Sequence, residues 1–416
     1  MSGERKMWAN RLQGKSGNIW IELDILLEEY KALNLGKGFP NFRPPHYVTD
    51  CLTKTASSDD PFLQQYTRSF GHPRLVKALA KTYSPIFERE IDPMNEVLVT
   101  LGADGSLFNS ALGFINPGDE AIIIEPAFDM YEPVVKFAGG VPVYIPLRPV
   151  NTGKEPSSAD WKLDEKELAA KFNSKTKVIF LNTPNNPLGK VFTQEELEMI
   201  AALCIKHNVI CISDEVYEWM IYPGQKHIKI ATLPGMWERT ITIGSAGKTF
   251  SVTGWKLGWS VGPADLIRAM SIVHQNSIYV CPTPLQEAVG CAFEYELAVV
   301  GKPESYFVQI VNELVEKRKK MADMLTHAGM LPSVPDGSYF MIADASNLGF
   351  EIDEDSADDK NVQIVKWLVK NKRIGSIPIS TFYSEEHKHL AESYVRFCFF
   401  KDDTTLNKAE EIIKSL

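Results

Sequence analysis

One loop of the chain carries residue types suited to covalent and phosphate chemistry. The run from Ile243 to Lys256 follows an apolar, strand-like segment and contains Ser245, Lys248 and Lys256 among several glycines. A lysine amine can bond covalently to a carbonyl carbon, while a hydroxyl and a second lysine can hold a phosphate. This combination predicts a pyridoxal phosphate (PLP) site in which Lys248 makes the covalent link.

Asp214 and Tyr217 are candidates for contacts to the cofactor ring. Asp214 ends the apolar run 209–213, where a buried charge needs a partner. A protonated pyridine nitrogen would be such a partner, and Tyr217 could donate a hydrogen bond to the phenolate oxygen of the ring. The alternative is that Asp214 only caps a following helix.

Two asparagines lie at and just beyond the end of the predicted strand 178–182. The segment from Asn182 to Gly189 reads Asn-Thr-Pro-Asn-Asn-Pro-Leu-Gly, and open α/β sheets bind ligands at the carboxyl ends of their strands. We expect the Asn186 amide to reach the same phenolate oxygen, with Asn182 beside it. An Asn/Pro/Gly turn that binds nothing is the alternative.

The segment Gly102–Ser106 predicts a phosphate site, although its glycine spacing alone is a weak signal. It follows a predicted strand and opens a helix, whose first backbone N–H groups bind anions. Ala103 and Asp104 lie in this first turn. Phe128, which follows the next predicted strand, could stack on the cofactor ring or be an ordinary core residue.

Arg396 is a charged residue inside the apolar run Tyr394–Phe400. An unpaired guanidinium in such a place is costly, so it needs an anionic partner. The carboxylate of a substrate suits its planar, two-pronged geometry. A structural ion pair with an acidic side chain is the alternative.

Two further patterns resemble functional motifs but fit them poorly. The run from Gly244 to Thr249 is similar to a nucleotide phosphate loop, but that motif needs a glycine where this chain has Thr242. His387 and His389 stand among charged residues, which favours a solvent-exposed surface over a metal site. We expect no metal.

The composition indicates a globular protein that binds neither nucleic acid nor membranes. The 416 residues carry a net charge of −9, whereas a nucleic-acid binder should be basic. No apolar segment is long enough to span a membrane. The six scattered cysteines favour reduced, buried thiols. The beginning of the sequence lacks an apolar signal core, so we expect a cytoplasmic protein, with mitochondria as the alternative.

Short apolar runs alternate with amphipathic stretches up to about residue 262, which predicts an α/β fold. Because the runs are continuous in Val, Ile and Leu, both faces of the strands should be covered, as in a mostly parallel sheet. Thr193 with Glu196 has the spacing of a helical capping box, and Asp164 with Glu167 repeats it. The seven predicted strands are Glu96–Thr100, Ala121–Glu125, Val141–Ile145, Val178–Asn182, Val209–Ser213, Thr240–Gly244 and Lys256–Val261.

Beyond about residue 300 the pattern changes to that of a smaller α+β unit. A long helical stretch leads to a predicted helix at Val362–Lys370, followed by strands Ile374–Ile379 and Tyr394–Phe400 and a last helix. The acidic run Glu351–Asp359 is interpreted as a solvated loop.

The order of the candidate site residues resembles that of the class I aminotransferases of PLP fold type I. Longer stretches resemble one branch of them, which comprises kynurenine aminotransferase, glutamine transaminase K and cysteine-conjugate β-lyase. This similarity covers nearly the whole chain. The stretches that carry it are Asn34–Phe42, Gln65–Thr67, Leu181–Phe192, Ser213–Tyr217, Pro234–Thr240 and His274–Ser277.

The resemblance implies a large PLP-binding domain at residues 48–300, with a seven-stranded mostly parallel sheet. A small α+β domain would combine residues 1–47 and 301–416. It also implies a homodimer, in which Tyr66 reaches the cofactor phosphate of the other subunit. Gly38 would join Arg396 at the substrate carboxylate. The substrate side chain would be enclosed by Trp20, Tyr131, Tyr279 and Phe340.

The activity implied is transfer of the amino group of L-kynurenine, glutamine or another large or aromatic L-amino acid to a 2-oxo acid. Kynurenine would give kynurenic acid. Lys248 would move the proton as general base and acid. A cysteine-conjugate β-lyase is the alternative. A PLP-sensing regulator would need an added basic helix-turn-helix segment, for which we expect no room.

Three positions depart from the pattern of many relatives. Lys37 stands where glutamine is common, Asp104 where tyrosine is common and Val280 where histidine is common. The Asp104 carboxylate would repel a phosphate unless it is paired or turned away. We expect these positions to influence which substrate is preferred.

Overall fold

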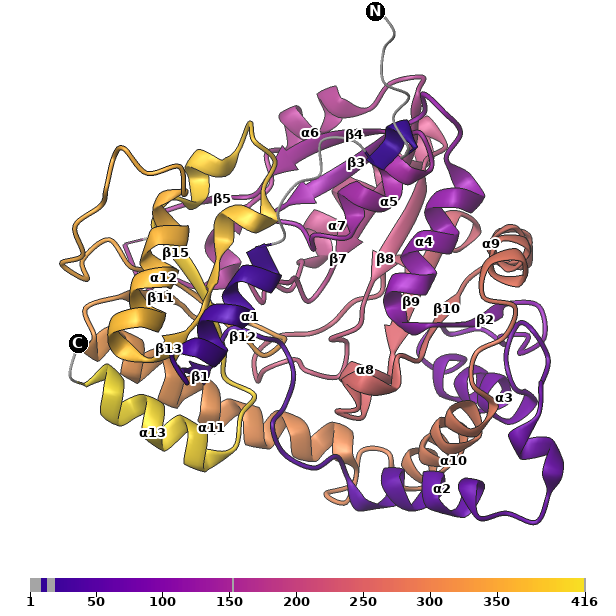
Figure 1. Cartoon of the computed structure of the whole chain (residues 1–416). Helices are drawn as coiled ribbons and strands as arrows, with labels where there is room; N and C mark the ends of the chain where they lie inside the picture. Colours follow the sequence, from indigo (N-terminus) through magenta and orange to yellow (C-terminus); the bar gives the residue numbers. More distant parts are fainter. Residues whose placement is uncertain (1–8, 13–18, 152, 415–416) are drawn as a thin grey trace, which may run out of the picture.

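A seven-stranded sheet forms the centre of the computed structural model, which describes residues 9–12, 19–151 and 153–414 (Figure 1). All seven strands predicted between residues 96 and 261 are present, with ends that differ by one or two residues. Across the sheet their order is β2 (Val97–Thr100), β10 (Gly258–Val261), β9 (Thr240–Ser245), β8 (Ile210–Asp214), β7 (Thr176–Asn182), β3 (Glu120–Glu125) and β4 (Val141–Pro146).

The sheet is mixed but mostly parallel, as the continuous apolar runs predict. Strand β10 is antiparallel to both of its neighbours, and the neighbouring pairs from β9 to β4 are parallel. Strands β2, β9 and β10 are buried along their whole length. Because parallel strands end at the same edge, the residues that follow β3, β7, β8 and β9 are brought together there.

Helices cover the sheet and begin where the sequence signals predict. Helix α4 (Gly102–Phe114) packs on β9 and β10 and against α5 (Tyr131–Phe137) and α9 (Ala264–Ser277). Helix α7 (Gln194–His207) starts with the predicted capping box, in which Thr193 and Glu196 bond reciprocally. Asp164 caps α6 (Glu165–Lys171) by accepting from the Glu167 N–H.

A smaller antiparallel sheet lies beside the first and is built from the later part of the chain. Its strands are β11 (Leu331–Ser333), β12 (Phe340–Asp344), β15 (Tyr394–Cys398) and β14 (Ile377–Pro378). The predicted strand Ile374–Ile379 is split, because β14 pairs with β15 whereas β13 (Ile374–Gly375) pairs with β1 (Leu33–Asn34). Figure 1 shows the early elements α1 and β1 among these late ones.

Helices complete both parts of the structure. Helix α11 (Tyr306–His327) packs on β11 and β12 and against α13 (Asp403–Ile413), and α12 (Lys360–Lys372) packs on β13, β14 and β15. The remaining elements are α1 (Ile19–Glu29), α2 (His46–Ala56), α3 (Pro73–Tyr83), α8 (Ala246–Thr249), α10 (Thr283–Val299), β5 (Arg148–Pro149), β6 (Trp161–Lys162) and the 3-10 turns η1 (Asn10–Leu12), η2 (Pro61–Gln64), η3 (Ser158–Asp160), η4 (Ile230–Thr232), η5 (Trp237–Arg239), η6 (Thr253–Trp255), η7 (Ile379–Phe382) and η8 (Lys388–Ala391). None of the described helices is long and apolar enough to cross a membrane.

The prediction that all cysteines are free thiols is wrong for one pair. Cys51 on α2 and Cys291 on α10 form a disulfide, with their Cα atoms 6.1 Å apart. The two helices pack side by side, which brings together residues separated by 240 positions in the sequence. The other four cysteines are free and buried.

The capping box of α7 gives a test of the local sequence signal. The Thr193 hydroxyl accepts from the Glu196 N–H at 3.3 Å, so Thr193→Ala should lower the free energy of unfolding by about 1 kcal/mol. Urea denaturation monitored by far-ultraviolet circular dichroism measures this change. Thr193→Ser keeps the hydroxyl and should stay close to the parent protein. An equal loss in both variants would contradict a role for the hydroxyl.

Candidate active site

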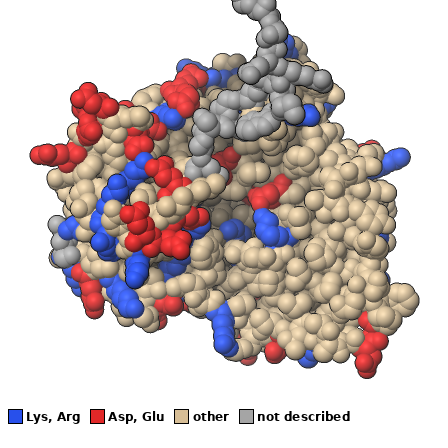
Figure 2. Space-filling model, viewed as in Figure 1, with Lys and Arg blue, Asp and Glu red and all other residues tan. Residues whose placement is uncertain are grey.

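A cavity of about 440 Å³ lies at the carboxyl edge of the large sheet, against the smaller one. The face shown in Figure 2 is hollowed near its middle, where basic and acidic side chains gather. Most of the site residues predicted from the sequence line this cavity. They are Trp20, Gly38, Ala103, Asp104, Phe128, Asn182, Asn186, Asp214, Tyr217, Ser245, Lys248, Lys256, Phe340 and Arg396.

Lys248 points into the cavity from α8, the single helical turn that follows β9. Its Nζ donates to the Tyr339 hydroxyl at 2.9 Å and to the Gly38 carbonyl at 3.2 Å. Burial lowers the pKa of the Lys248 amine to about 8, because a desolvated ammonium is disfavoured. A larger fraction of this amine is therefore neutral and nucleophilic than in an exposed lysine.

Asp214 is buried at the end of β8 and accepts a hydrogen bond from the Tyr131 hydroxyl at 2.8 Å. Burial raises the pKa of Asp214 to about 6, although the bond from Tyr131 opposes the shift. Residues 215–219 form turns rather than a helix, so Asp214 does not cap a helix. A cationic group in the cavity would find in Asp214 a desolvated carboxylate with no ammonium or guanidinium paired to it among the described residues.

The two asparagines link the ends of β7 and β8 to the middle of β15. The Asn182 amide donates to the Asp214 carbonyl at 2.9 Å, and its oxygen accepts from the Asn186 N–H at 2.7 Å. The Asn186 side-chain oxygen accepts from Arg396 Nη1 at 2.7 Å. This bond leaves the NH₂ group of Asn186 as the part that can donate to a ligand.

Arg396 is buried on β15 without an ion pair to any carboxylate of the described residues, so the structural ion pair considered above is absent. Besides Asn186, it donates to the Gly36 carbonyl at 2.9 Å, and its Nε has no partner. The guanidinium lies over the Phe340 ring at 4.0 Å. Burial lowers the pKa of Arg396 to about 10. A buried cation with an unused N–H favours an anionic ligand.

Another part of the cavity lining combines a helix start with a lysine. Helix α4 begins at Gly102, whose φ is +70°, and Lys256 also adopts the left-handed conformation. A side chain at position 102 would meet Lys256 Nζ at 3.2 Å. Lys256 forms an ion pair with Asp104 at 2.6 Å. The lysine compensates the charge of the Asp104 carboxylate, which reduces the repulsion expected between this carboxylate and a phosphate. Ser245 and Thr253 also line the cavity.

Tyr131 and Tyr279, predicted as walls of the substrate pocket, are not among the residues that line the cavity, and Tyr66 was predicted to reach the other subunit instead. Tyr131 does not line the cavity but is buried behind it, because its hydroxyl bonds Asp214. Tyr66 and Tyr279 are largely exposed, with their ring centroids 5.5 Å apart. Among the departures from the family pattern, Lys37 lines the cavity and pairs with Asp24, whereas Val280 does not line it.

Several residues of the cavity were not singled out in the sequence. Phe382 and Phe39 add aromatic surface, and Thr253 adds a hydroxyl. Tyr339 lies directly behind, where it links Lys248 to Gly38 by donating to the Gly38 carbonyl at 2.7 Å. The aromatic run around residue 339 is a signal that could have been followed, but Phe382 reaches the cavity only through the packing of the two sheets.

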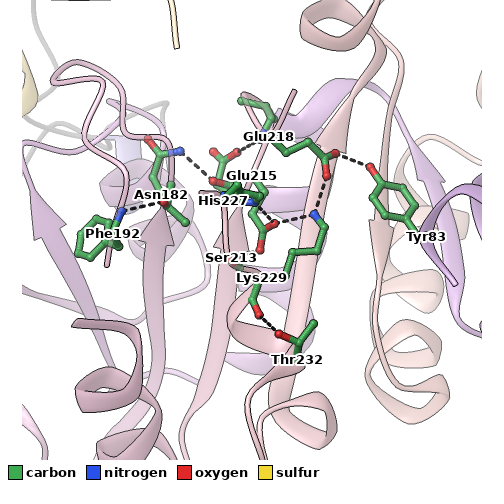
Figure 3. A network of polar contacts seen from close by, with 12 residues as sticks. Tyr83, Asn182, Phe192, Ser213, Glu215, Glu218, His227, Lys229 and Thr232 are labelled. Carbon is green, nitrogen blue, oxygen red and sulfur yellow. Dashed lines mark hydrogen bonds and ion pairs between the residues drawn. The ribbon is translucent and has the colours of Figure 1, made fainter. Parts of the chain in front are cut away.

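A buried polar network supports the turn that carries Asp214 and Tyr217 (Figure 3). Lys229 Nζ donates to Glu215 at 2.7 Å and to Glu218 at 2.5 Å. These two glutamates alternate with Asp214 and Tyr217 along the turn, so the network holds it from behind. Further members are Tyr83, Ser213 and His227.

The donor set fits PLP. The cofactor needs an amine, a carboxylate for its ring nitrogen, donors for its phenolate oxygen and a phosphate cradle. Lys248, Asp214, Asn186 and Tyr217 supply the first three, and the start of α4 with Ser245 and Lys256 supplies the cradle. The orphaned Nε of Arg396 remains for a second anion, the substrate.

The comparisons with known proteins agree with this donor set. The model of the family "Aminotransferase class I and II" matches residues 30–413. Human kynurenine–oxoglutarate transaminase 3 is 55% identical over 414 residues, which cover 98% of this chain and 90% of the relative. Human kynurenine–oxoglutarate transaminase 1 is 48% identical over 415 residues, with 99% and 98% covered.

Two solved structures are also similar to this chain over nearly its whole length. Bna3p of Saccharomyces cerevisiae superposes with a TM-score of 0.92 at 34% identity, covering 99% of both chains. A Thermus thermophilus aspartate aminotransferase mutant gives a TM-score of 0.84 at 26% identity, covering 99% of this chain and 100% of that one. The chain therefore belongs to the class I and II aminotransferases and has their fold-type-I architecture.

Proposed function

We propose that this transaminase uses PLP to transfer the amino group of L-kynurenine, glutamine or another large or aromatic L-amino acid to a 2-oxo acid. Kynurenine would yield kynurenic acid. The observation that carries the proposal is the buried Arg396, which forms no ion pair with an acidic residue in the described part of the chain and lies in the same cavity as Lys248. The similarity to kynurenine–oxoglutarate transaminases supports the choice of donors.

Arg396 and Asn186 would bind and orient the substrate carboxylate. Arg396 is held by the Gly36 carbonyl and the Asn186 oxygen, and it lines the cavity. A guanidinium bound on both sides cannot rotate freely, and orientation of the substrate lowers the entropic part of the barrier. Gly38 leaves room for this contact, because a Cβ there would lie 2.5 Å from the Phe340 ring.

Lys248 would take the proton from the substrate Cα as general base and, as general acid, deliver it to C4′ of the cofactor. When bound, PLP supplies an electron sink for the charge left on Cα. The lowered pKa of Lys248 suits this role, since the amine must be neutral to accept a proton. Asp214 would keep a proton on the pyridine nitrogen, and Tyr217 with Asn186 would donate to the phenolate oxygen.

The aromatic lining supports large donors. Trp20, Phe128, Phe340 and Phe382 all line the cavity, and Trp20 is held by a bond from its Nε1 to Asp129 at 2.7 Å. Aromatic walls favour apolar and aromatic substrate side chains over small acidic ones.

The assembly that we propose is a homodimer with two sites. The exposed Tyr66 and Tyr279 support this, because large exposed aromatic side chains mark interaction surfaces, and Tyr66 would reach the phosphate in the other subunit. Each subunit would consist of a large domain at 48–300 and a small one from 1–47 and 301–416. A cytoplasmic location is proposed from the composition, and cell fractionation tests it.

Purified protein supplied with PLP should be yellow and should transaminate a panel of donors with several 2-oxo acids, kynurenine, glutamine and aromatic donors being preferred. Lys248→Ala should abolish turnover, because the other two lysines that line the cavity, Lys37 and Lys256, are held in ion pairs with Asp24 and Asp104. Lys206→Ala, at an exposed helix end, is the matched control. Normal transamination by the Lys248 variant would overturn the mechanism. Pyruvate formed from a cysteine conjugate without a 2-oxo acid would instead favour the β-lyase.

Capture of PLP by the apoprotein should depend on pH through Lys248. Only the neutral amine attacks an aldehyde, so the rate should rise with pH, about tenfold per unit, and level off above about pH 8. Stopped-flow absorbance measures this rate. A midpoint near that of an exposed lysine, roughly 10.4, would contradict the effect of burial.

Replacement of Arg396 separates substrate binding from cofactor binding. Arg396→Gln should lower kcat/KM by about 100-fold or more, because charged hydrogen bonds to the carboxylate are lost. Arg396→Lys retains the charge but not the two-pronged geometry, so its loss should be partial. The PLP absorbance of both variants should match the parent protein. A parallel loss of cofactor would assign Arg396 to the cofactor site instead.

A further inference from the structure

A buried carboxylate–imidazole pair joins the two sheets next to the cavity. Glu125 is the last residue of β3 in the large sheet, and His387 lies between η7 and η8, beside the smaller sheet. His387 Nδ1 and Glu125 Oε2 are 2.5 Å apart, and both side chains are buried. The charged sequence neighbours of His387 predicted a solvent-exposed surface. This prediction is wrong, because the His387 side chain is buried.

The same carboxylate also binds the beginning of this segment. The Ser384 backbone N–H donates to Glu125 Oε1, and the Ser384 hydroxyl donates to Oε2 at 3.2 Å. Two residues beyond Glu125, the Ala127 N–H donates to the Phe382 carbonyl at 2.8 Å. The segments 125–128 and 382–387 are thus held together by four hydrogen bonds, all between residues far apart in the sequence.

Each of these two segments carries an aromatic wall of the cavity. Phe128 and Phe382 line the cavity, whereas Glu125 and His387 do not. Phe382 also lies edge-on to Trp20, with ring centroids 6.3 Å apart, and 5.0 Å from the Arg396 guanidinium. Displacement of segment 382–387 would therefore move one wall and disturb the surroundings of Arg396.

The pair is expensive to bury and needs both partners. The side chains of Tyr383 and Tyr144, which lie near Glu125, carry no positive charge. No lysine or arginine forms an ion pair with Glu125 in the described part of the chain. His387 is its cationic or N–H partner, and the exposed Glu386 lies 3.9 Å from the other ring nitrogen. A buried carboxylate deprived of one strong donor favours separation of the segments, which would let water reach it.

We propose that Glu125 and His387 are positioning residues of the transaminase, which fix the separation of Phe128 and Phe382 and so shape the pocket for large donor side chains. The inference rests on the proposed function. The pair acts through Phe382, whose segment 382–387 it holds against the end of β3, while Phe128, the residue expected to stack on the cofactor ring, stays with the strand. Among the described residues, the pair makes no hydrogen bond to Lys248 or Asp214.

Two substitutions at His387 test whether the hydrogen bond between Nδ1 and Glu125 positions the segment. In His387→Asn the side-chain amide nitrogen takes the place of Nδ1, so it can still donate to Glu125. In His387→Gln the amide nitrogen takes the place of Nε2 instead, so the donation is lost. His389→Gln is the control, because this neighbouring histidine is exposed and its hydrogen bond among the described residues is to the Glu386 carbonyl.

The measurements are steady-state kinetics with kynurenine and equilibrium binding of 3-phenylpropionate to the PLP-loaded protein, well below its thermal midpoint. This ligand has the carboxylate and an aromatic ring but no amine. For His387→Gln we expect KM and Kd to rise about tenfold, with kcat and PLP absorbance little changed. His387→Asn and His389→Gln should remain within about twofold of the parent protein.

The outcomes separate the inference from the proposed function. Equal behaviour of the Asn and Gln variants at position 387, whether both retain or both lose binding, would overturn the positioning role. A lower thermal midpoint with unchanged binding would also overturn it, since the pair would then be only structural. If the parent protein fails to transaminate any large donor, the proposed function fails, whereas 3-phenylpropionate binding still reports on the pocket walls.

Discussion

The burial of charge at the end of β8 is the constraint on which the site depends. Asp214 ends a strand covered on both faces, so its carboxylate lies where solvent cannot stabilise it. The surrounding structure offsets part of this cost through the hydrogen bonds that the carboxylate accepts from the Tyr131 hydroxyl and the Val216 N–H. The Lys229 network holds the same turn through Glu215 and Glu218. The position of Asp214 is therefore determined by the packed sheet, and a ring nitrogen held in the cavity would be presented to a desolvated carboxylate.

Arg396 poses the same problem with the opposite sign and from the other sheet. Its guanidinium is stabilised by two oxygen atoms and the Phe340 ring rather than by an acid. The oxygen of Asn186 belongs to the loop after β7, so the cation is bonded across the boundary between the two sheets. The lining of the cavity thus contains two anion-binding elements, Arg396 and the α4 start with Lys256, together with Lys248.

Sequence signals were reliable for interactions between residues close together in the chain. The Thr193 capping box and the Asp164 cap formed as predicted, because each involves residues three positions apart. The sequence failed where two distant segments decide the outcome. Cys51 meets Cys291 because α2 packs against α10, and His387 is buried because Glu125 lies opposite it. Tyr131 similarly bonds Asp214 instead of lining the cavity.

By itself, the sequence determined the strands, their two-sided burial and the residue types that a PLP enzyme needs. The reason is that a continuous apolar run and the polar residues at its end are adjacent in the chain. The tertiary structure decided which of these residues face one cavity. It paired Asp104 with Lys256, bonded Arg396 to Asn186 and Gly36, and introduced Tyr339 and Phe382 beside the predicted set. The reason is that these contacts join the large sheet to segments from both ends of the chain, and such distances depend on how the two sheets pack.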